Sequence, residues 1–283
     1  MPTILLVDNG SRRAASTLSL RRIAAGLASR CGTPVHPVSL LHSDRVPASE
    51  LGGEPAVTFV SFMTAQINQG MRDFIVLPLF FGPSRAVTQY IPEQVDALLG
   101  RLADGETGEQ ETVVRVADVL WKQPGGEPKL VDLLSENVIQ VVRSSDFDSP
   151  LVLVVDHGSP LPEVTAVRNA VATQLQSRLG GEYEVLEAAM EGRPGTEYAF
   201  NGPLLRDLLL DVAQQGARAR DVVLAMLFLS PGRHAGVGGD ISGICADVQQ
   251  QATALRITPT PLVGENPLLI DILHDRLQEV LHN

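Results

Sequence analysis

The chain has 283 residues, 44% of them hydrophobic and 19% charged, so it is long enough for two globular domains and too apolar to be disordered. A formal net charge of −11 argues against a nucleic-acid partner, because phosphate binding depends on clustered lysine and arginine. The two cysteines, Cys31 and Cys245, are far apart, which argues against a disulfide framework and suits a reducing cytoplasm. The apolar start of the chain predicts a strand rather than a signal peptide, and we expect a cytoplasmic protein with no membrane partner.

In chain order, short apolar runs alternate with longer stretches of helical spacing. The runs typical of strands buried on both faces are Thr3–Val7, Phe74–Leu79, Leu151–Val155 and Val222–Leu229. The helical stretches between them include Ala14–Ser29, Glu163–Leu179 and Leu204–Gln215. This alternation predicts an α/β protein built from parallel βαβ units. Ligands of such sheets bind beyond the carboxyl ends of the strands.

The sequence also repeats itself. Residues 4–11 match 152–159, residues 79–86 match 227–234, and residues 127–134 match 266–273. Three blocks in the same order predict a tandem duplication, with modules at 1–148 and 149–283 and a polar linker at 144–150.

Two histidines of the second module stand at equivalent places, each after a predicted strand. His157 precedes Gly158-Ser159, and His234 follows Pro231-Gly232-Arg233. Imidazoles from neighbouring strand ends can share one divalent ion or act as bases near neutral pH. Either histidine alone is more often a packing or surface residue, but the pair at matching strand ends favours a site.

Glu191 ends the next predicted strand and is a candidate third ligand or proton acceptor, with a solvated loop carboxylate as the equal alternative. Glu187 is the weaker candidate because it lies within that strand. Aligning the halves with a one-residue gap pairs Glu187 with Ser39, and Glu191 with His42.

These motifs resemble the CbiX family of sirohydrochlorin chelatases: a strand followed by His157-Gly158-Ser159, a Met190-Glu191 strand end, and the segment from Leu227 to His234. The resemblance covers nearly the whole chain as a fused pair of family modules. It implies two chelatase-like modules, each a parallel four-stranded sheet flanked by helices. It also implies a lyase-type chelatase that inserts Co²⁺ or Fe²⁺ into sirohydrochlorin in cobalamin or siroheme biosynthesis.

Residue by residue, the resemblance makes His157 and His234 the metal-binding and catalytic positions. Glu191 matches the family's acidic position, although the loop from Gly192 to Pro203 departs in length. The metal is then a substrate, and no cofactor is expected to stay bound. The alternative is a carrier that keeps the metal or tetrapyrrole ligands without turnover. The fused halves predict a monomer, with a homodimer as the alternative.

Since sirohydrochlorin is a polycarboxylate, an acidic chain needs arginines beside its site. Arg233 is the best candidate for pairing with substrate carboxylates, and Arg193 is the second. Ser159 is a candidate hydrogen-bond donor to a carboxylate, with capping of the following helix as the favoured alternative. The segment Gly236–Asp240 predicts a loop that closes over the macrocycle, with Asp240 as the N-cap of the next helix.

The first module lacks the histidines, since Asn9 and Ala86 stand where His157 and His234 stand. We therefore expect a degenerate module that packs against the catalytic one. Family relatives with two modules carry the catalytic residues in their first half, so this chain reverses that order. A sharper alternative has His36 or His42 of the first module contributing to the cleft.

Overall fold

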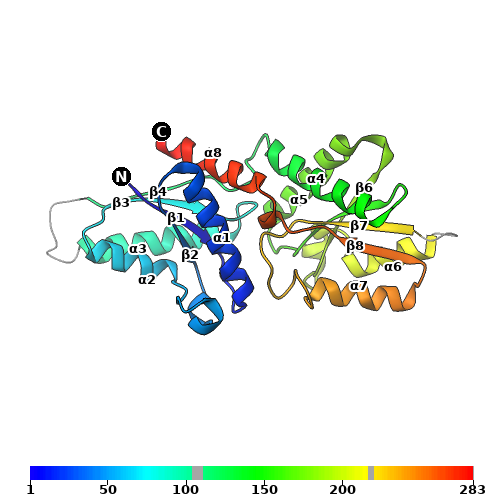
Figure 1. Cartoon of the computed structure of the whole chain (residues 1–283), viewed down its shortest axis with the longest axis horizontal. Coiled ribbons are helices and arrows are strands. Elements are labelled where there is room, and N and C mark those ends of the chain that lie inside the picture. The colour runs from blue at the N-terminus through cyan, green and yellow to red at the C-terminus, as the bar shows by residue number, and fades with distance from the viewer. Residues whose placement is uncertain (104–110, 216–219, 283) are drawn as a thin grey trace. The chain divides into compact units, whose positions relative to one another are not determined.

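The computed structural model describes residues 1–103, 111–215 and 220–282 (Figure 1). The chain forms two compact units: unit 1 is residues 1–122 with 270–283, and unit 2 is residues 123–269. Within the described ranges, no helix combines the length and the apolar character needed to cross a membrane.

Each unit contains one parallel sheet of four strands. In unit 1 the order is β2-β1-β3-β4, with β1 Thr3–Asp8, β2 Val35–Ser39, β3 Asp73–Pro78 and β4 Val113–Val116. In unit 2 the order is β6-β5-β7-β8, with β5 Leu151–Asp156, β6 Glu184–Ala189, β7 Arg220–Met226 and β8 Leu255–Pro259. The predicted fold class is confirmed. The central strand β5 is buried from end to end, and β1 is buried up to its last residue, Asp8, as expected of strands covered on both faces.

The helices connect the strands as right-handed crossovers require. Their bounds are α1 Ala14–Cys31, α2 Phe59–Asn68, α3 Ile91–Ala103, α4 Pro128–Ser145, α5 Pro162–Leu179, α6 Leu205–Gln215, α7 Asp240–Gln251 and α8 Leu268–His282. Short helical turns lie at η1 Ser43–Arg45, η2 Ala48–Leu51, η3 Ala86–Tyr90, η4 Gly180–Glu182, η5 Thr196–Asn201 and η6 Val263–Glu265.

The last helix of each repeat packs with the sheet of the other repeat. Helix α4 belongs to the first repeat in sequence but packs against α5 and β7 of unit 2, where Arg178 Nε lies 2.6 Å from Asp132 Oδ1. Helix α8 ends the chain in unit 1, where Arg276 Nη2 donates to the Leu120 carbonyl at 2.8 Å. The compact units therefore divide after residues 122 and 269, whereas the predicted modules 1–148 and 149–283 describe the sequence repeat.

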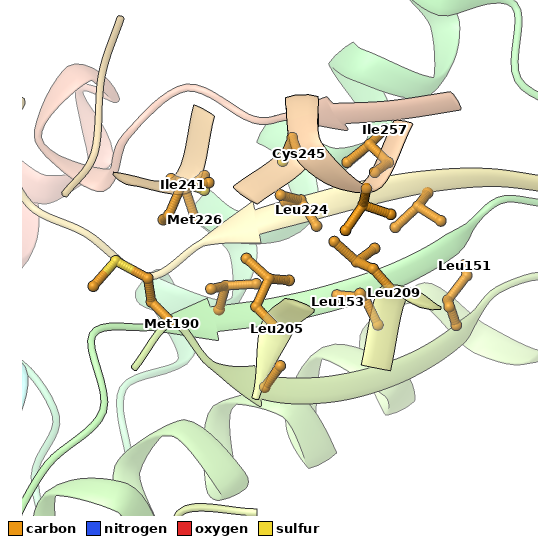
Figure 2. Close-up of a cluster of buried hydrophobic side chains, with 14 of the residues drawn as sticks. Leu151, Leu153, Met190, Leu205, Leu209, Leu224, Met226, Ile241, Cys245 and Ile257 are labelled. Carbon is orange, nitrogen blue, oxygen red and sulfur yellow. The ribbon is translucent and has the colours of Figure 1, made fainter. Parts of the chain in front are cut away.

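The core of unit 2 holds the strand ends in place. Figure 2 shows side chains of β5 and β7 meeting those of α6 and α7, with Leu153, Leu209, Leu224, Met226 and Ile241 all at most 3% exposed. Each such side chain contributes about 1.5–3 kcal/mol relative to an exposed one. Met190 closes the cluster directly before Glu191, so the loops that follow β5, β6 and β7 start from a rigid base.

Candidate metal site

His157 follows β5 on a turn that admits only glycine at its next position. Gly158 has φ +89°, and a Cβ there would lie 2.2 Å from the Glu191 carbonyl oxygen. The Glu191 amide donates to the His157 carbonyl at 3.2 Å across the same contact. The close approach of the two backbones brings the loop after β6 against the loop after β5. It thereby sets Glu191 beside His157.

The structure brings the three predicted ligands together. The His157 Nε2 atom lies 3.2 Å from His234 Nε2 and 3.2 Å from Glu191 Oε1. The two imidazole rings meet edge to face, with their centroids 4.4 Å apart. The side chains of His157 and Glu191 are 46% and 59% exposed, so the site is open to solvent on one side.

The hydrogen-bond contacts of Nδ1 bear on the tautomer of each histidine. His234 Nδ1 lies 2.7 Å from Asp240 Oδ2, and an ionised carboxylate only accepts hydrogen bonds, so this nitrogen carries the proton. His157 Nδ1 lies 3.1 Å from the Gly158 carbonyl and its Nε2 lies 3.2 Å from Glu191 Oε1, so both nitrogens of this ring face an acceptor. The Nε2 of His234 therefore presents a lone pair when its ring is neutral, and the Nε2 of His157 does so when its proton is on Nδ1.

When both rings carry their proton on Nδ1, two nitrogen lone pairs and a carboxylate oxygen face one another, and a cation among these three atoms would stabilise the arrangement. A tetrahedral ion with bonds of about 2.0–2.1 Å to imidazole nitrogen sets its donor atoms about 3.3 Å apart. The separations of 3.2 Å at His157 Nε2 match that spacing. Over the described residues, no three His, Cys, Asp or Glu side chains form a complete metal-binding group. Both contacts are made by His157, so the site consists of two histidines flanked by a carboxylate and is not a closed cage.

Asp240 is a site residue that the sequence interpretation missed. The N-cap of α7 is Gly239, not Asp240 as predicted, and Asp240 is the first helical residue. The amide of Ile241 donates to the His234 carbonyl at 3.1 Å, so the glycine-rich loop 235–239 begins and ends beside His234. Carboxylates that hold metal-binding histidines in this way orient the ring and raise its basicity. A signal was available: an acidic residue at the start of the helix that follows the His234 loop.

The predicted substrate-binding residues lie around this site in different settings. The Arg233 side chain is 78% exposed, with its Nε 3.7 Å from Asp240 Oδ2. The Arg193 guanidinium lies 5.8 Å from the centre of the Tyr198 ring. Ser159 Oγ accepts from the Leu161 amide at 3.0 Å, but the N-cap of α5 is Leu161, so the predicted capping by Ser159 is wrong.

The first repeat presents no equivalent ligands. The Leu41 amide donates to the Asn9 carbonyl just as Glu191 does to His157, so the counterpart of Glu191 is Leu41 and not His42. The strand register likewise pairs Pro37, not Ser39, with Glu187. The predicted pairing is wrong by one and two residues, because the connections that precede β2 and β6 differ. His36 lies against the Phe62 ring, with centroids 4.9 Å apart, and burial lowers its pKa.

Solved structures with this fold define the class as a tandem chelatase fold. SirB from Bacillus subtilis with Fe³⁺ superposes with a TM-score of 0.71 at 16% identity, covering 99% of this chain and 96% of that one. SirB from Bacillus subtilis subspecies spizizenii in complex with cobalt gives a TM-score of 0.68 at 17% identity, covering 100% and 97%.

At the sequence level, residues 151–280 match the CbiX family model. The chloroplastic sirohydrochlorin ferrochelatase of Arabidopsis thaliana is 28% identical over 141 residues, which make up 50% of this chain. The match spans 57% of that relative's length. The family segment contains His157, Glu191, His234 and Asp240.

Proposed function

We propose that this protein is a metallochelatase that inserts Co²⁺ or Fe²⁺ into sirohydrochlorin at His157 and His234. The observation that carries the proposal is the separation of 3.2 Å between the two Nε2 atoms, with Asp240 holding Nδ1 of His234 and with Glu191 Oε1 3.2 Å from His157 Nε2. Such a pair binds a divalent ion and leaves coordination positions open for the ring nitrogens of a macrocycle.

The chemistry needs ligands that release the ion and a base that takes up protons. Metal insertion removes the pyrrole N–H protons as the ion enters the ring. Neutral imidazole meets both requirements, because it binds borderline divalent metals reversibly and accepts protons near neutral pH. We assign Glu191 as a third ligand during delivery or as the first proton acceptor, since Oε1 lies 3.2 Å from His157 Nε2.

The substrate assignment rests on the names of relatives and on charge. The Arabidopsis relative is a sirohydrochlorin ferrochelatase. Arg233 directly precedes His234, and Arg193 follows Glu191 by two residues. At these places a guanidinium can pair with carboxylates at the rim of a bound tetrapyrrole. We assign these two arginines and Ser159 to substrate binding.

The proposal also concerns which metal ion is inserted. The SirB structures contain Fe³⁺ in one case and cobalt in the other. Two imidazoles and one carboxylate accept either divalent ion, so ligand identity does not select between them. Initial rates with Co²⁺, Fe²⁺ and Ni²⁺ at equal free concentration, under anaerobic conditions, measure the preference directly.

Insertion by the purified full chain tests the proposal. Wild-type protein, sirohydrochlorin and Co²⁺ should remove the absorption of the free macrocycle well above the rate without protein. If both substrates bind and the rate stays spontaneous, the chelatase assignment fails and the carrier alternative replaces it.

A further inference from the structure

An arginine buried beneath the candidate site has no role in the chemistry proposed above. Arg168 of α5 is fully buried, with 0% of the residue exposed. Its Nη1 donates to Asp156 Oδ1 at 2.8 Å, and its Nη2 donates to the Asn201 carbonyl at 2.6 Å. Burying a guanidinium carries a large desolvation cost, which only well-formed charged and polar contacts offset.

Both partners of Arg168 hold the turn that carries His157. Asp156 directly precedes the histidine, and its Oδ1 also accepts from the Gly158 amide at 3.0 Å. The Asn201 side chain binds both backbone groups of Ser159, the residue after Gly158. Its Oδ1 accepts from the Ser159 amide at 3.0 Å, and its Nδ2 donates to the Ser159 carbonyl at 2.7 Å. The backbone on each side of His157 is therefore fixed to one guanidinium, directly or through a single side chain.

The first repeat shows the same turn without this arginine. Its α1 begins at Ala14 as α5 begins at Pro162, so Leu20 stands where Arg168 stands, and it is 1% exposed. The equivalent aspartate is retained as Asp8, whose Oδ1 is buried without a hydrogen-bond partner. The next residue, Arg21, donates to the carbonyls of Leu51 and Glu54 and not to the aspartate. The repeat that lacks the histidine thus also lacks the arginine.

We propose that Arg168 is a positioning residue for His157, which sets the imidazole at the distance from His234 that metal binding requires. The guanidinium links Asp156 to the Asn201 loop, so the turn cannot move without breaking charged hydrogen bonds in a buried setting. The proposal rests on the proposed metal-binding role of His157. It extends the site to residues that touch neither the metal nor the macrocycle.

The test uses Co²⁺ alone, titrated into the purified full chain and followed by the visible absorption of histidine-bound Co²⁺. The main variant is Arg168→Leu with Asp156→Asn, which copies the leucine of the first repeat and removes the unpaired charge. A second variant, Asn201→Ala, releases Ser159 and keeps the ion pair. The matched control is Arg178→Leu, which breaks an exposed arginine–aspartate pair on the same helix, 2.6 Å between Nε and Asp132 Oδ1.

We expect both site variants to weaken Co²⁺ binding about 10–100-fold, the usual effect of losing a second layer of contacts around a metal ligand. The control should bind like wild type. In insertion assays the double variant should lower kcat while KM for sirohydrochlorin stays within about twofold, because it changes no residue assigned to the macrocycle. Asn201→Ala releases Ser159, which we assign to substrate binding, so this variant is judged on Co²⁺ affinity alone. Arg168→Lys should recover part of the affinity, since an ammonium pairs with Asp156 but spans fewer partners.

Folded variants that bind Co²⁺ as wild type does would overturn the positioning role. Should the double variant fail to fold, Arg168→Lys decides: unchanged affinity overturns the proposal, and weakened affinity supports it, because lysine keeps the charge beside Asp156 but cannot also reach the Asn201 carbonyl. Failure of the proposed function gives a different result, because wild-type protein would then bind no Co²⁺ through His157 or insert none.

Discussion

Asp240 Oδ2 lies 2.7 Å from His234 Nδ1, at the start of α7 and six residues beyond the histidine it holds. The contact keeps the proton on Nδ1 and leaves Nε2 free to face His157. It also joins the two ends of the glycine-rich loop between them.

Replacing Asp240 with asparagine should weaken metal binding about 10–100-fold, because the amide is uncharged and can turn its own donor toward the ring. Co²⁺ titration of the variant measures the effect. Asp247→Asn, an exposed change on the same helix, is the matched control and should leave the affinity unchanged. Equal affinity in both variants would contradict the orienting role of Asp240.

Removing either histidine should abolish insertion without unfolding the protein. His157→Ala and His234→Ala each delete one lone pair of the facing Nε2 atoms, and a single imidazole binds a divalent ion weakly. The side chains are 46% and 28% exposed, so we expect stability to change by less than about 1 kcal/mol. Insertion assays and thermal unfolding separate the two effects, with His282→Ala as the control at an exposed histidine. Insertion that survives in His157→Ala would rule out the proposed site.

Much of the fold is predictable because the strands are local apolar runs. The predicted strand Leu151–Val155 is one residue shorter than β5, and the predicted helix Glu163–Leu179 one residue shorter than α5. The pairing of His157 with His234 follows from strand ends that meet at one edge of a parallel sheet. That step needs no knowledge of side-chain contacts.

The missed features depend on tertiary contacts that no local pattern encodes. An apolar stripe shows that α4 and α8 are buried, but it does not specify which sheet covers them, so the helix exchange was not predicted. The Asp240–His234 contact depends on the path of a loop whose glycines allow many conformations. Leu41 was missed as the counterpart of Glu191 because the connection before β2 is two residues shorter than the one before β6, and this difference has no sequence marker.

Restoring one histidine to the first repeat should not create a second site. In Asn9→His the new imidazole would lie beside Leu41 and Ala86, which supply no ligand atom. We expect total insertion to change by less than about twofold, since one imidazole does not form a divalent-metal site. Insertion rates of Asn9→His in the wild-type and His157→Ala backgrounds measure this. Recovered activity in the double variant would show that the first repeat is not degenerate.

The retained aspartate of the first repeat should make unit 1 less stable as pH rises. Burial raises the pKa of Asp8 from 3.8 to about 6, against smaller opposing hydrogen bonds from Ser39 and Gly10. The folded chain then holds a proton that the unfolded chain has lost between about pH 4 and pH 6. The free energy of unfolding therefore falls across that window, by up to about 3 kcal/mol, and is insensitive to this group outside it.

Asp8→Asn keeps the size of the side chain and removes the titration. At pH 8 the variant should be more stable than wild type by up to about 3 kcal/mol, and near pH 4 the two should be equal. Trp121, the single tryptophan, is buried in unit 1, so its fluorescence in urea reports the unfolding of that unit at each pH. Asp156→Asn provides the contrast: it replaces the carboxylate that pairs with the buried Arg168 guanidinium at 2.8 Å by a neutral amide, and it should destabilise unit 2 by up to about 3–5 kcal/mol at pH 8. A wild-type fluorescence transition that is independent of pH between 4 and 7 would show that Asp8 is solvated or paired in solution. The two aspartates would then not differ in the way that the loss of one arginine predicts.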